Sequence, residues 1–267
     1  MRQIVRQFGE WQERVEQLSA LLDGCGRTIL LPAWQERPGG NIKADGSIVT
    51  ATDLACQELL AAELAKIDPT IPLLGEEMEE AEQLHLIGSE RCWCLDPLDG
   101  TSNFATSNPG FAISLALIER GAPQLALILD PARRELFAAV RGYGATLNGL
   151  PIHASSEVRL PASLGAIDFK RLAPELAMRL AVSRNYRSQR NIGSCALEWG
   201  WLAAGRLQFI VHGGEKLWDY AAGSLIAGEA GCAVGDFQGA PLPFDRLSSP
   251  IAAAANVRLQ EQLLPLL

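Results

Sequence analysis

The sequence predicts a mixed α/β protein whose first half, residues 1–150, is of the α+β type and whose second half, residues 151–267, is of the α/β type. In the first half, two helical stretches precede a series of short apolar runs that have the length of strands. In the second half, strand-like and helical stretches alternate along the chain. Apolar residues make up 48% of the 267 residues, which is enough for a large core and excludes an intrinsically disordered chain.

The first half begins with apolar side chains at helical spacing over residues 4–31, which predicts one long amphipathic helix. Glycines and a proline within residues 38–46 then predict a loop or a tight hairpin. A second helix is expected to open at Asp53, and its apolar side is expected to consist of leucines, namely Leu54, Leu59, Leu60 and Leu64. The expected strands of this half span residues 71–74, 91–95, 111–118, 124–129 and 135–141.

The second half follows Asn148 and Gly149, a pair typical of a turn. Its expected strands span residues 163–168, 207–211, 232–237 and 250–255. Its expected helices span residues 173–182, 195–204, 219–229 and 257–264.

The chain is acidic, with a formal net charge of −8. A negative surface repels a phosphate backbone, so we expect no nucleic-acid partner. The N-terminal stretch is charged throughout and no run reaches the roughly 18 apolar residues that a membrane span needs, so we expect no signal peptide and no membrane partner. The six cysteines are scattered in mostly apolar surroundings, which favours reduced thiols and a cytoplasmic location.

Carboxylates stand at the ends of three apolar runs, where a strand can bring a side chain to the edge of a cleft. Glu76 follows the first run, Asp96 and Asp99 follow the second, and Asp219 follows the third. Each segment alone has an ordinary interpretation as an acidic helix start, a turn or a helix cap. The three together, in this order, predict one acidic site.

Asp96 and Asp99 are separated by Pro97 and Leu98, and carboxylates so close repel each other unless a cation neutralises them. The donors in this segment are all oxygens, which favours Mg²⁺, with Mn²⁺ as an alternative. Zinc is disfavoured, because no histidine stands at ligand spacing from a second histidine or a cysteine.

Gly100, Thr101 and Ser102 follow directly, and a helix that starts there would direct free backbone N–H groups at an anion. A metal beside such a phosphate cradle favours hydrolysis of a phosphate ester by metal-activated water. Phosphatases of the haloacid dehalogenase type are disfavoured, because their nucleophile and acid/base aspartates stand two residues apart, whereas Asp96 and Asp99 stand three apart.

The acidic segments resemble the motifs of the inositol monophosphatase family, the Mg²⁺-dependent, lithium-sensitive sugar-phosphate phosphatases. They are Gly75-Glu76-Glu77, Asp96-Pro97-Leu98-Asp99-Gly100-Thr101-Ser102-Asn103-Phe104 and Trp218-Asp219-Tyr220-Ala221-Ala222-Gly223. The likeness extends from about residue 40 to residue 237 and includes residues 50–53 and 193–196. It implies a layered αβαβα fold with the site between the two halves, and a homodimer by analogy with family members.

The resemblance implies a set of metal ligands. Glu76, Asp96 and the carbonyl of Leu98 resemble the ligands of a first metal. Asp96, Asp99 and Asp219 resemble those of a second. Glu76 would also help to hold a third, weaker metal through waters.

The resemblance also implies which residues act on the substrate. Thr101, supported by Asp53, would orient the attacking water, and Glu76 is included in the catalytic set. Backbone N–H groups of Gly100 and Thr101 would hold the phosphate. The full set of expected substrate contacts is Asp99, Gly100, Thr101, Ala196, His212 and Asp219.

His212 departs from the family pattern, because inositol-selective members commonly carry a carboxylate seven residues before the position of Asp219. Lys216 and Arg184 are candidates for positive charge near the substrate. The leading prediction is therefore a phosphomonoesterase for a small polyol or sugar phosphate of the inositol monophosphate kind. Fructose-1,6-bisphosphate, 3′-phosphoadenosine 5′-phosphate, NADP and histidinol phosphate stay open as substrates, and a regulatory protein that binds a macromolecular partner on the same fold is the alternative of another class.

Overall fold

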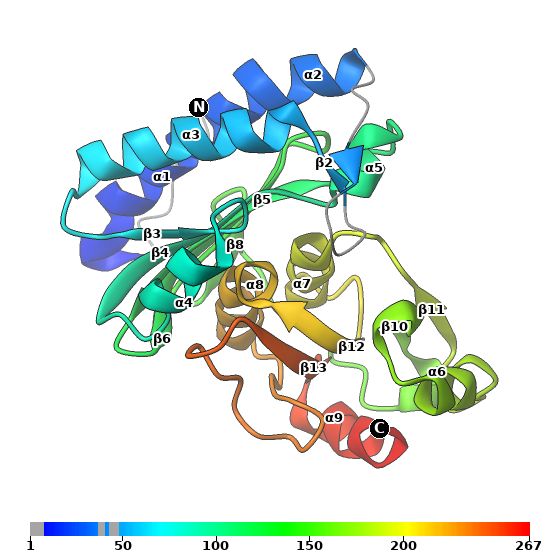
Figure 1. The fold of residues 1–267 in the computed structure, drawn as a ribbon. Coiled ribbons are helices and arrows are strands. Elements are labelled where there is room, and N and C mark those ends of the chain that lie inside the picture. Colours follow the sequence, from blue (N-terminus) through cyan, green and yellow to red (C-terminus); the bar gives the residue numbers. More distant parts are fainter. Residues whose placement is uncertain (1–7, 37–40, 43–47) are drawn as a thin grey trace.

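The layers of the protein alternate between helices and sheets in a computed structural model that describes residues 8–36, 41–42 and 48–267 (Figure 1). Helices α1 (Gln12–Cys25) and α3 (Ala51–Ile67) cover one face of a large sheet. Helices α7 (Cys195–Ala203) and α8 (Leu217–Glu229) lie between its other face and a smaller sheet. Helices α6 (Pro174–Ala181) and α9 (Val257–Leu263) lie beyond the smaller sheet, which confirms the layered αβαβα fold.

The opening helix continues past its predicted end at residue 31. A short 3₁₀ turn (Gly9–Trp11) leads into α1, a π-helical turn (Gly26–Leu30) follows, and α2 (Leu31–Gln35) completes the element. Pro32 lies in the first turn of α2, where its missing N–H and fixed φ are tolerated. Residues 4–7 of the predicted helix lie outside the described residues.

Helix α3 begins two residues before Asp53, because Thr50 is its N-cap and Asp53 occupies the third helical position. Together they form a capping box, in which each side chain satisfies a backbone N–H of the helix start. The buried side is formed by Cys56, Leu60 and Leu64. The prediction for Leu54 is wrong, since that side chain is 48% exposed.

In the described part of the chain, the large sheet has the strand order β3-β4-β5-β6-β7-β8-β9. Its strands are β3 (Leu73–Gly75), β4 (Arg91–Asp99), β5 (Ala112–Glu119), β6 (Ala122–Asp130), β7 (Glu135–Val140), β8 (Ala145–Leu147) and β9 (Leu150–Pro151). Only the β3–β4 pair is parallel among these described strands, and the others form an antiparallel meander. The two-residue strands β1 (Asn41–Ile42) and β2 (Ile48–Val49) pair antiparallel, and the proline and glycines of the predicted turn lie outside the described residues.

In the described part of the chain, the smaller sheet has the order β11-β10-β12-β13. Its strands are β10 (Leu164–Asp168), β11 (Ser188–Arg190), β12 (Phe209–Lys216) and β13 (Ser248–Ala254). The strand expected at 232–237 is wrong, because only Ala233 forms a bridge, to Ala254. Gly235 lies inside that stretch, and a glycine weakens a strand.

The sequence missed several short elements, which are too brief to show a hydrophobic period. They are α4 (Glu80–Leu86), β8, β9 and β11. Helix α5 (Thr101–Ala105) starts where the sequence analysis considered a helix start. The boundary at residue 150 stays a prediction, because one continuous apolar cluster includes side chains from both of its sides.

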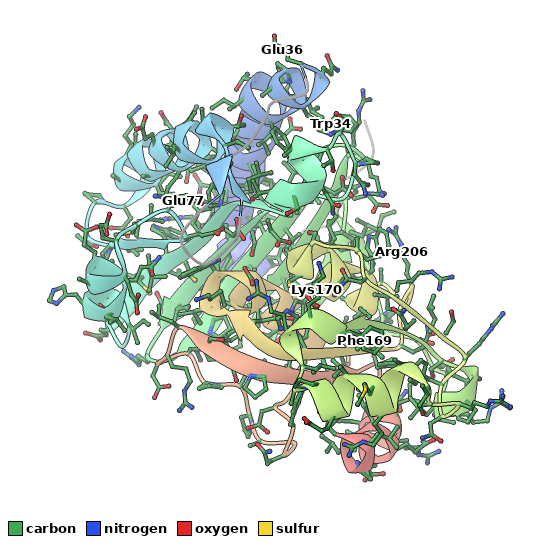
Figure 2. The ribbon with its side chains drawn as sticks, turned by 45° about the vertical axis from the view of Figure 1, so that its right-hand side comes forward. Trp34, Glu36, Glu77, Phe169, Lys170 and Arg206 are labelled. Atoms are coloured by element: carbon green, nitrogen blue, oxygen red, sulfur yellow. The ribbon has the colours of Figure 1, made fainter. Side chains whose placement is uncertain are left out.

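A second apolar cluster fills the space between the large sheet and helices α1 and α3. All six cysteines fall within the described ranges and are free thiols. None of the described helices is long and apolar enough to cross a membrane. Figure 2 labels Glu77 on the large-sheet side of the molecule and Lys170 on the small-sheet side, and the site lies between these two parts.

Candidate active site

A cavity of about 710 Å³ opens where the ends of β4 and β12 approach the starts of α5, α7 and α8. This volume falls in the range of about 300–1,000 Å³ that small-molecule sites occupy. The predicted site residues that line it are Glu76, Asp96, Leu98, Asp99, Gly100, Thr101, His212 and Asp219. Asp53 and Ala196 are not part of its lining.

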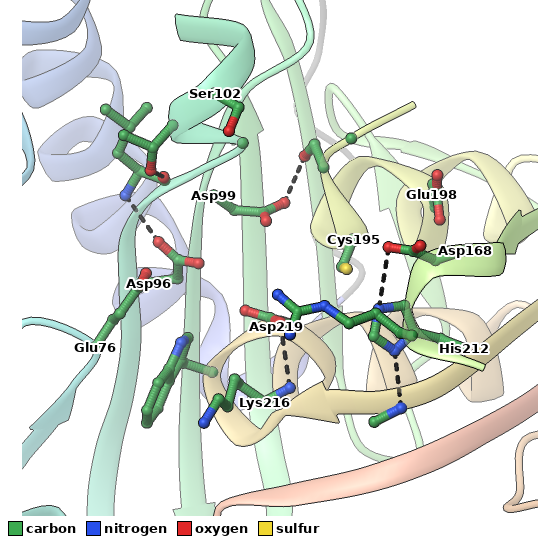
Figure 3. A pocket seen from close by; sticks show the side chains of 18 of the residues that line it. Glu76, Asp96, Asp99, Ser102, Asp168, Cys195, Glu198, His212, Lys216 and Asp219 are labelled. Carbon is green, nitrogen blue, oxygen red and sulfur yellow. Dashed lines mark hydrogen bonds and ion pairs between the residues drawn. The ribbon is translucent and has the colours of Figure 1, made fainter. Parts of the chain in front are cut away.

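Asp96 and Asp99 both face the cavity although they are three residues apart on one strand (Figure 3). In a regular strand this spacing would send the two side chains to opposite faces. Strand β4 carries a register shift between them, since Asp96 pairs with Ser114 and Asp99 pairs with Ala112. This bulge between them thus brings both carboxylates to one side.

Asp219 reaches the same place from helix α8. It lies in the first turn of the helix, where its Oδ2 accepts a hydrogen bond of 3.2 Å from the backbone N–H of Lys216. One carboxylate oxygen each of Asp96, Asp99 and Asp219 lies within 4.8 Å of the other two. Glu76, at the end of β3, points toward Asp96 in Figure 3.

The electrostatics of this cluster are unfavourable without a cation. Burial raises the pKa of Asp96 well above its ordinary value, and the negative charges of Glu76 and Asp99 raise it further. Burial likewise raises the pKa of Asp219, and Asp99 adds to the effect. The donors are carboxylate oxygens that converge on one point, so the residues present fit a hard divalent cation such as Mg²⁺ or Mn²⁺.

Asp99 is held by the start of helix α7. Its Oδ2 accepts hydrogen bonds from the Ser194 hydroxyl and, at 2.8 Å, from the backbone N–H of Ala196. The prediction that Ala196 contacts substrate is not supported by this placement, because Ala196 is fully buried and its N–H is engaged by Asp99. Its neighbour Cys195 lines the cavity instead.

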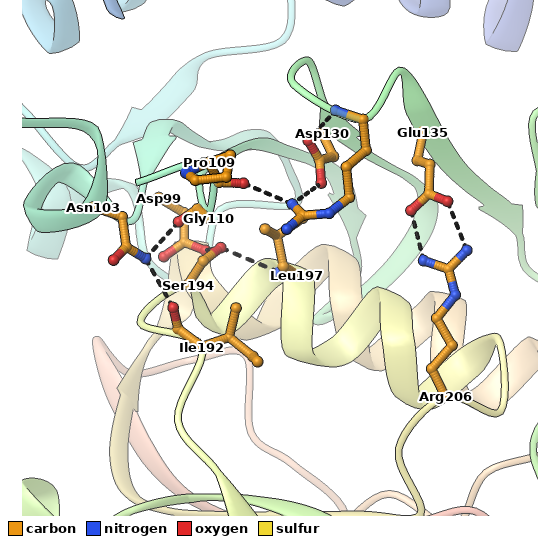
Figure 4. A network of polar contacts seen from close by, with 11 residues as sticks. Asp99, Asn103, Pro109, Gly110, Asp130, Glu135, Ile192, Ser194, Leu197 and Arg206 are labelled. Carbon is orange, nitrogen blue, oxygen red and sulfur yellow. Dashed lines mark hydrogen bonds and ion pairs between the residues drawn. The ribbon is translucent and has the colours of Figure 1, made fainter. Parts of the chain in front are cut away.

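The loop before α7 is fastened to the loop after α5 by Asn103 (Figure 4). Its amide nitrogen donates to the carbonyl of Gly110 at 2.7 Å and to that of Ile192 at 2.8 Å. This bridge joins segments 89 residues apart and fixes the part of the site contributed by α7 against the part contributed by β4.

Asp53 is not a lining residue, but it contacts Thr101, which is one. The Thr101 hydroxyl is 3.0 Å from Oδ1 of Asp53 and 3.0 Å from the carbonyl oxygen of Leu98. The other oxygen of Asp53 accepts from the backbone N–H of Thr50 at 2.8 Å. Burial raises the pKa of Asp53 although these hydrogen bonds lower it.

Gly100 makes the turn between β4 and α5 with a φ of +88°. A Cβ on this residue would lie 2.5 Å from the carbonyl oxygen of Gly110, so the position requires glycine for both its conformation and its space. The backbone N–H groups that open α5 have no partner within the helix, as at any helix start.

His212 lies on β12 and both of its ring nitrogens are engaged. Nδ1 accepts a hydrogen bond of 3.1 Å from the N–H of Gly214, so the neutral ring carries its proton on Nε2. Nε2 lies 3.6 Å from Oδ2 of Asp168. The hydrogen bond with His212 lowers the pKa of Asp168.

Some cavity residues were missed by the sequence analysis. They are Asp168, Lys170, Arg171, Cys195 and Glu198. The first three stand at the end of a predicted strand, which is the criterion that found the acidic segments and could have found these as well. Arg184, which was considered as a source of positive charge, is not among the lining residues, whereas Lys216 is.

Comparisons with known proteins show the family and the fold. The model of the inositol monophosphatase family matches residues 11–267. "Inositol monophosphatase 1" of Solanum lycopersicum is 35% identical over 226 residues, which cover 82% of this chain and 82% of that protein. "Nus factor SuhB" of Escherichia coli strain K12 is 35% identical over 204 residues, 74% of each chain. The solved structure of the IMPase of Thermotoga maritima superposes with a TM-score of 0.84 at 29% identity and covers 95% of this chain and 96% of that one.

Proposed function

The chain belongs to the inositol monophosphatase family, and on that premise we propose that it is a metal-dependent phosphomonoesterase for a small polyol or sugar phosphate. The observation that carries the proposal is the convergence of Asp96, Asp99 and Asp219 within 4.8 Å in a cavity large enough for such a substrate. Buried carboxylates that repel one another are costly unless a cation binds them.

The metal-binding residues in this proposal are Glu76, Asp96, Asp99 and Asp219, together with the carbonyl oxygen of Leu98. When bound, divalent cations activate water and stabilise the negative charge that develops during phosphoryl transfer. Two divalent cations would balance the negative charges of the four carboxylates. A third would be held more weakly through Glu76.

Thr101 positions the nucleophile in this proposal. Its hydroxyl can donate to only one of its two acceptors, Asp53 and Leu98, and its lone pairs are free to accept a hydrogen bond from a water in the cavity. Gly100 lets the phosphate approach the backbone N–H groups at the start of α5. The water would then attack the phosphorus in line with the leaving alkoxide.

The experiment that tests the proposal is an assay of phosphate monoesters with and without Mg²⁺, and with added lithium. The panel contains inositol 1-phosphate, fructose-1,6-bisphosphate, 3′-phosphoadenosine 5′-phosphate, NADP and histidinol phosphate. We expect Mg²⁺-dependent release of phosphate that lithium inhibits and that Asp96→Asn abolishes. Release that persists in the Asp96→Asn variant would contradict the proposal.

The relatives named Nus factor favour a second candidate, a regulatory protein that binds a macromolecular partner on this fold. Complementation of cells that lack the gene, with the wild-type protein or the Asp96→Asn variant, distinguishes the two candidate functions. A catalytic function is lost with Asp96→Asn, whereas a partner-binding function survives that change. A homodimer and a cytoplasmic location stay predictions, which light scattering and fractionation test.

A further inference from the structure

The cavity wall formed by the smaller sheet carries positive charge, whereas the carboxylates of the metal-binding cluster carry negative charge. Lys170, Arg171 and Lys216 all line the cavity. Among the described residues, none of these three side chains forms an ion pair within 4.0 Å. All three side chains are exposed, and Lys216 also lies over the ring of Trp218, 6.0 Å from its centroid.

The fold brings these cations together from two segments. Asp168 pairs with His212 in the parallel β10–β12 register, and the chain then turns over β12 through the 3₁₀ turn η4 (Phe169–Arg171). A Cβ on Gly213 would lie 1.8 Å from the carbonyl oxygen of Arg171, so the absence of a side chain at Gly213 permits this contact. Strand β12 then shifts register between His212 and Glu215, just before Lys216.

The neighbouring carboxylates do not cancel this charge. Asp168 keeps its negative charge, because the hydrogen bond with His212 lowers its pKa, but it is one carboxylate beside three cations. Burial raises the pKa of Glu198 to about 8, so this side chain is mostly uncharged at neutral pH. The wall therefore keeps an excess of positive charge facing the cavity.

From this arrangement we infer that Lys170, Arg171 and Lys216 form a second anion site, and that the substrate is a phosphate ester carrying another phosphate or carboxylate group. The inference rests on the proposed phosphatase function, in which the ester phosphate that is cleaved lies at Asp96, Asp99 and Gly100. The second anionic group then lies on the wall of the smaller sheet. A cation that binds a phosphate oxygen directly forms the stronger, charge-assisted kind of hydrogen bond.

Matched substrates test the inference. Fructose 1,6-bisphosphate and fructose 1-phosphate share the same reacting ester, and 3′-phosphoadenosine 5′-phosphate and adenosine 3′-phosphate form a second such pair. We expect the wild-type protein to show a higher kcat/KM for the doubly charged member of at least one pair. Equal values within both pairs would overturn the inference while leaving the phosphatase function in place.

The arginine variant tests which residues are responsible. In Arg171→Gln the ratio of the two kcat/KM values should fall about tenfold, through KM of the doubly charged substrate, as expected for loss of a hydrogen bond to a charged group. Lys216→Gln should also lower the ratio of the two kcat/KM values. Arg184→Gln is the matched control, because Arg184 is exposed and outside the cavity, and its ratio should stay within twofold of wild type. An unchanged ratio in both cavity variants would contradict the inference.

Calorimetry with the same compounds covers the case in which no ester is hydrolysed and the phosphatase function itself fails. Tighter binding of fructose 1,6-bisphosphate than of fructose 1-phosphate, lost in Arg171→Gln and kept in Arg184→Gln, would support the anion site without the reaction. Equal binding of the two compounds would contradict the second anion site as well.

Discussion

The hydroxyl of Thr101 lies 3.0 Å from Oδ1 of Asp53, a residue 48 positions earlier in the chain. Asp53 is itself fixed by the backbone N–H of Thr50 at 2.8 Å, within the capping box of helix α3. A helix cap on one side of the large sheet thereby sets the orientation of a hydroxyl in the cavity.

Replacing Asp53 by asparagine tests this positioning. Asparagine has nearly the same shape but is neutral and offers a donor group, so Thr101 would lose its fixed orientation. We expect kcat of the phosphatase reaction to fall by about 10²-fold, with KM little changed. Asp68→Asn is the control, because Asp68 is a half-buried residue at the other end of α3, outside the cavity. Wild-type kcat in Asp53→Asn would show that this pair has no part in the reaction.

Asp219→Asn should have opposite effects on stability and on metal binding. It removes one of the repelling charges, so the metal-free protein should unfold at a temperature a few degrees higher. It also removes a metal donor, so the Mg²⁺ concentration that gives half of the thermal stabilisation should rise at least about tenfold. The exposed Asp245→Asn serves as control in the same thermal scans. A variant that keeps wild-type Mg²⁺ stabilisation would contradict the ligand assignment.

Glu198 gives a prediction about pH. Its pKa is raised by burial from 4.5 to about 8 in the folded protein. The folded state therefore binds more protons than the unfolded state between these values, and the free energy of unfolding falls as pH rises from 4.5 to about 8. Glu198→Gln should flatten that part of the profile, as measured by urea unfolding at several pH values. An identical slope in the variant would show that Glu198 is charged in the folded state.

Gly100 can be compared with Gly88, since both have a positive φ, +88° and +81°. An alanine at Gly88 meets no atom within 4 Å, so Gly88→Ala should lower the free energy of unfolding by about 1 kcal/mol from conformation alone. In Gly100→Ala the new Cβ would also overlap the carbonyl oxygen of Gly110, so the free energy of unfolding should fall by about 2–4 kcal/mol. It should also reduce phosphatase activity, which Gly88→Ala should leave intact. Equal stability losses would mean that the turn at Gly100 can widen.

The acidic cluster was predictable because each of its members belongs to a short segment with a recognisable order of residues. Asp96 and Asp99 predicted a hard divalent cation through their close spacing and oxygen donors, although the bulge that turns both to one side became visible only in the pairing of β4 with β5. The family resemblance supplied the layered fold, which composition and periodicity leave open.

Other parts of the site depend on pairings that the sequence does not display. Asp168 meets His212 only because β10 and β12 are adjacent and parallel, although the two residues stand 44 positions apart in the chain. Ala196 and Cys195 differ by one helical position. The rotational position of helix α7 determines that Cys195, and not Ala196, lines the cavity. The same uncertainty of phase explains why Leu54 was wrongly placed in the core.

The most direct test of the central claim is the anomalous diffraction from crystals grown with Mn²⁺. We predict peaks at which oxygens of Asp96, Asp99 and Asp219 lie about 2.0–2.2 Å from a metal, with a further peak beside Glu76 and Asp96. The peaks should vanish in crystals of the Asp96→Asn variant grown under the same conditions. Wild-type crystals in which these carboxylates bind no metal would contradict the account.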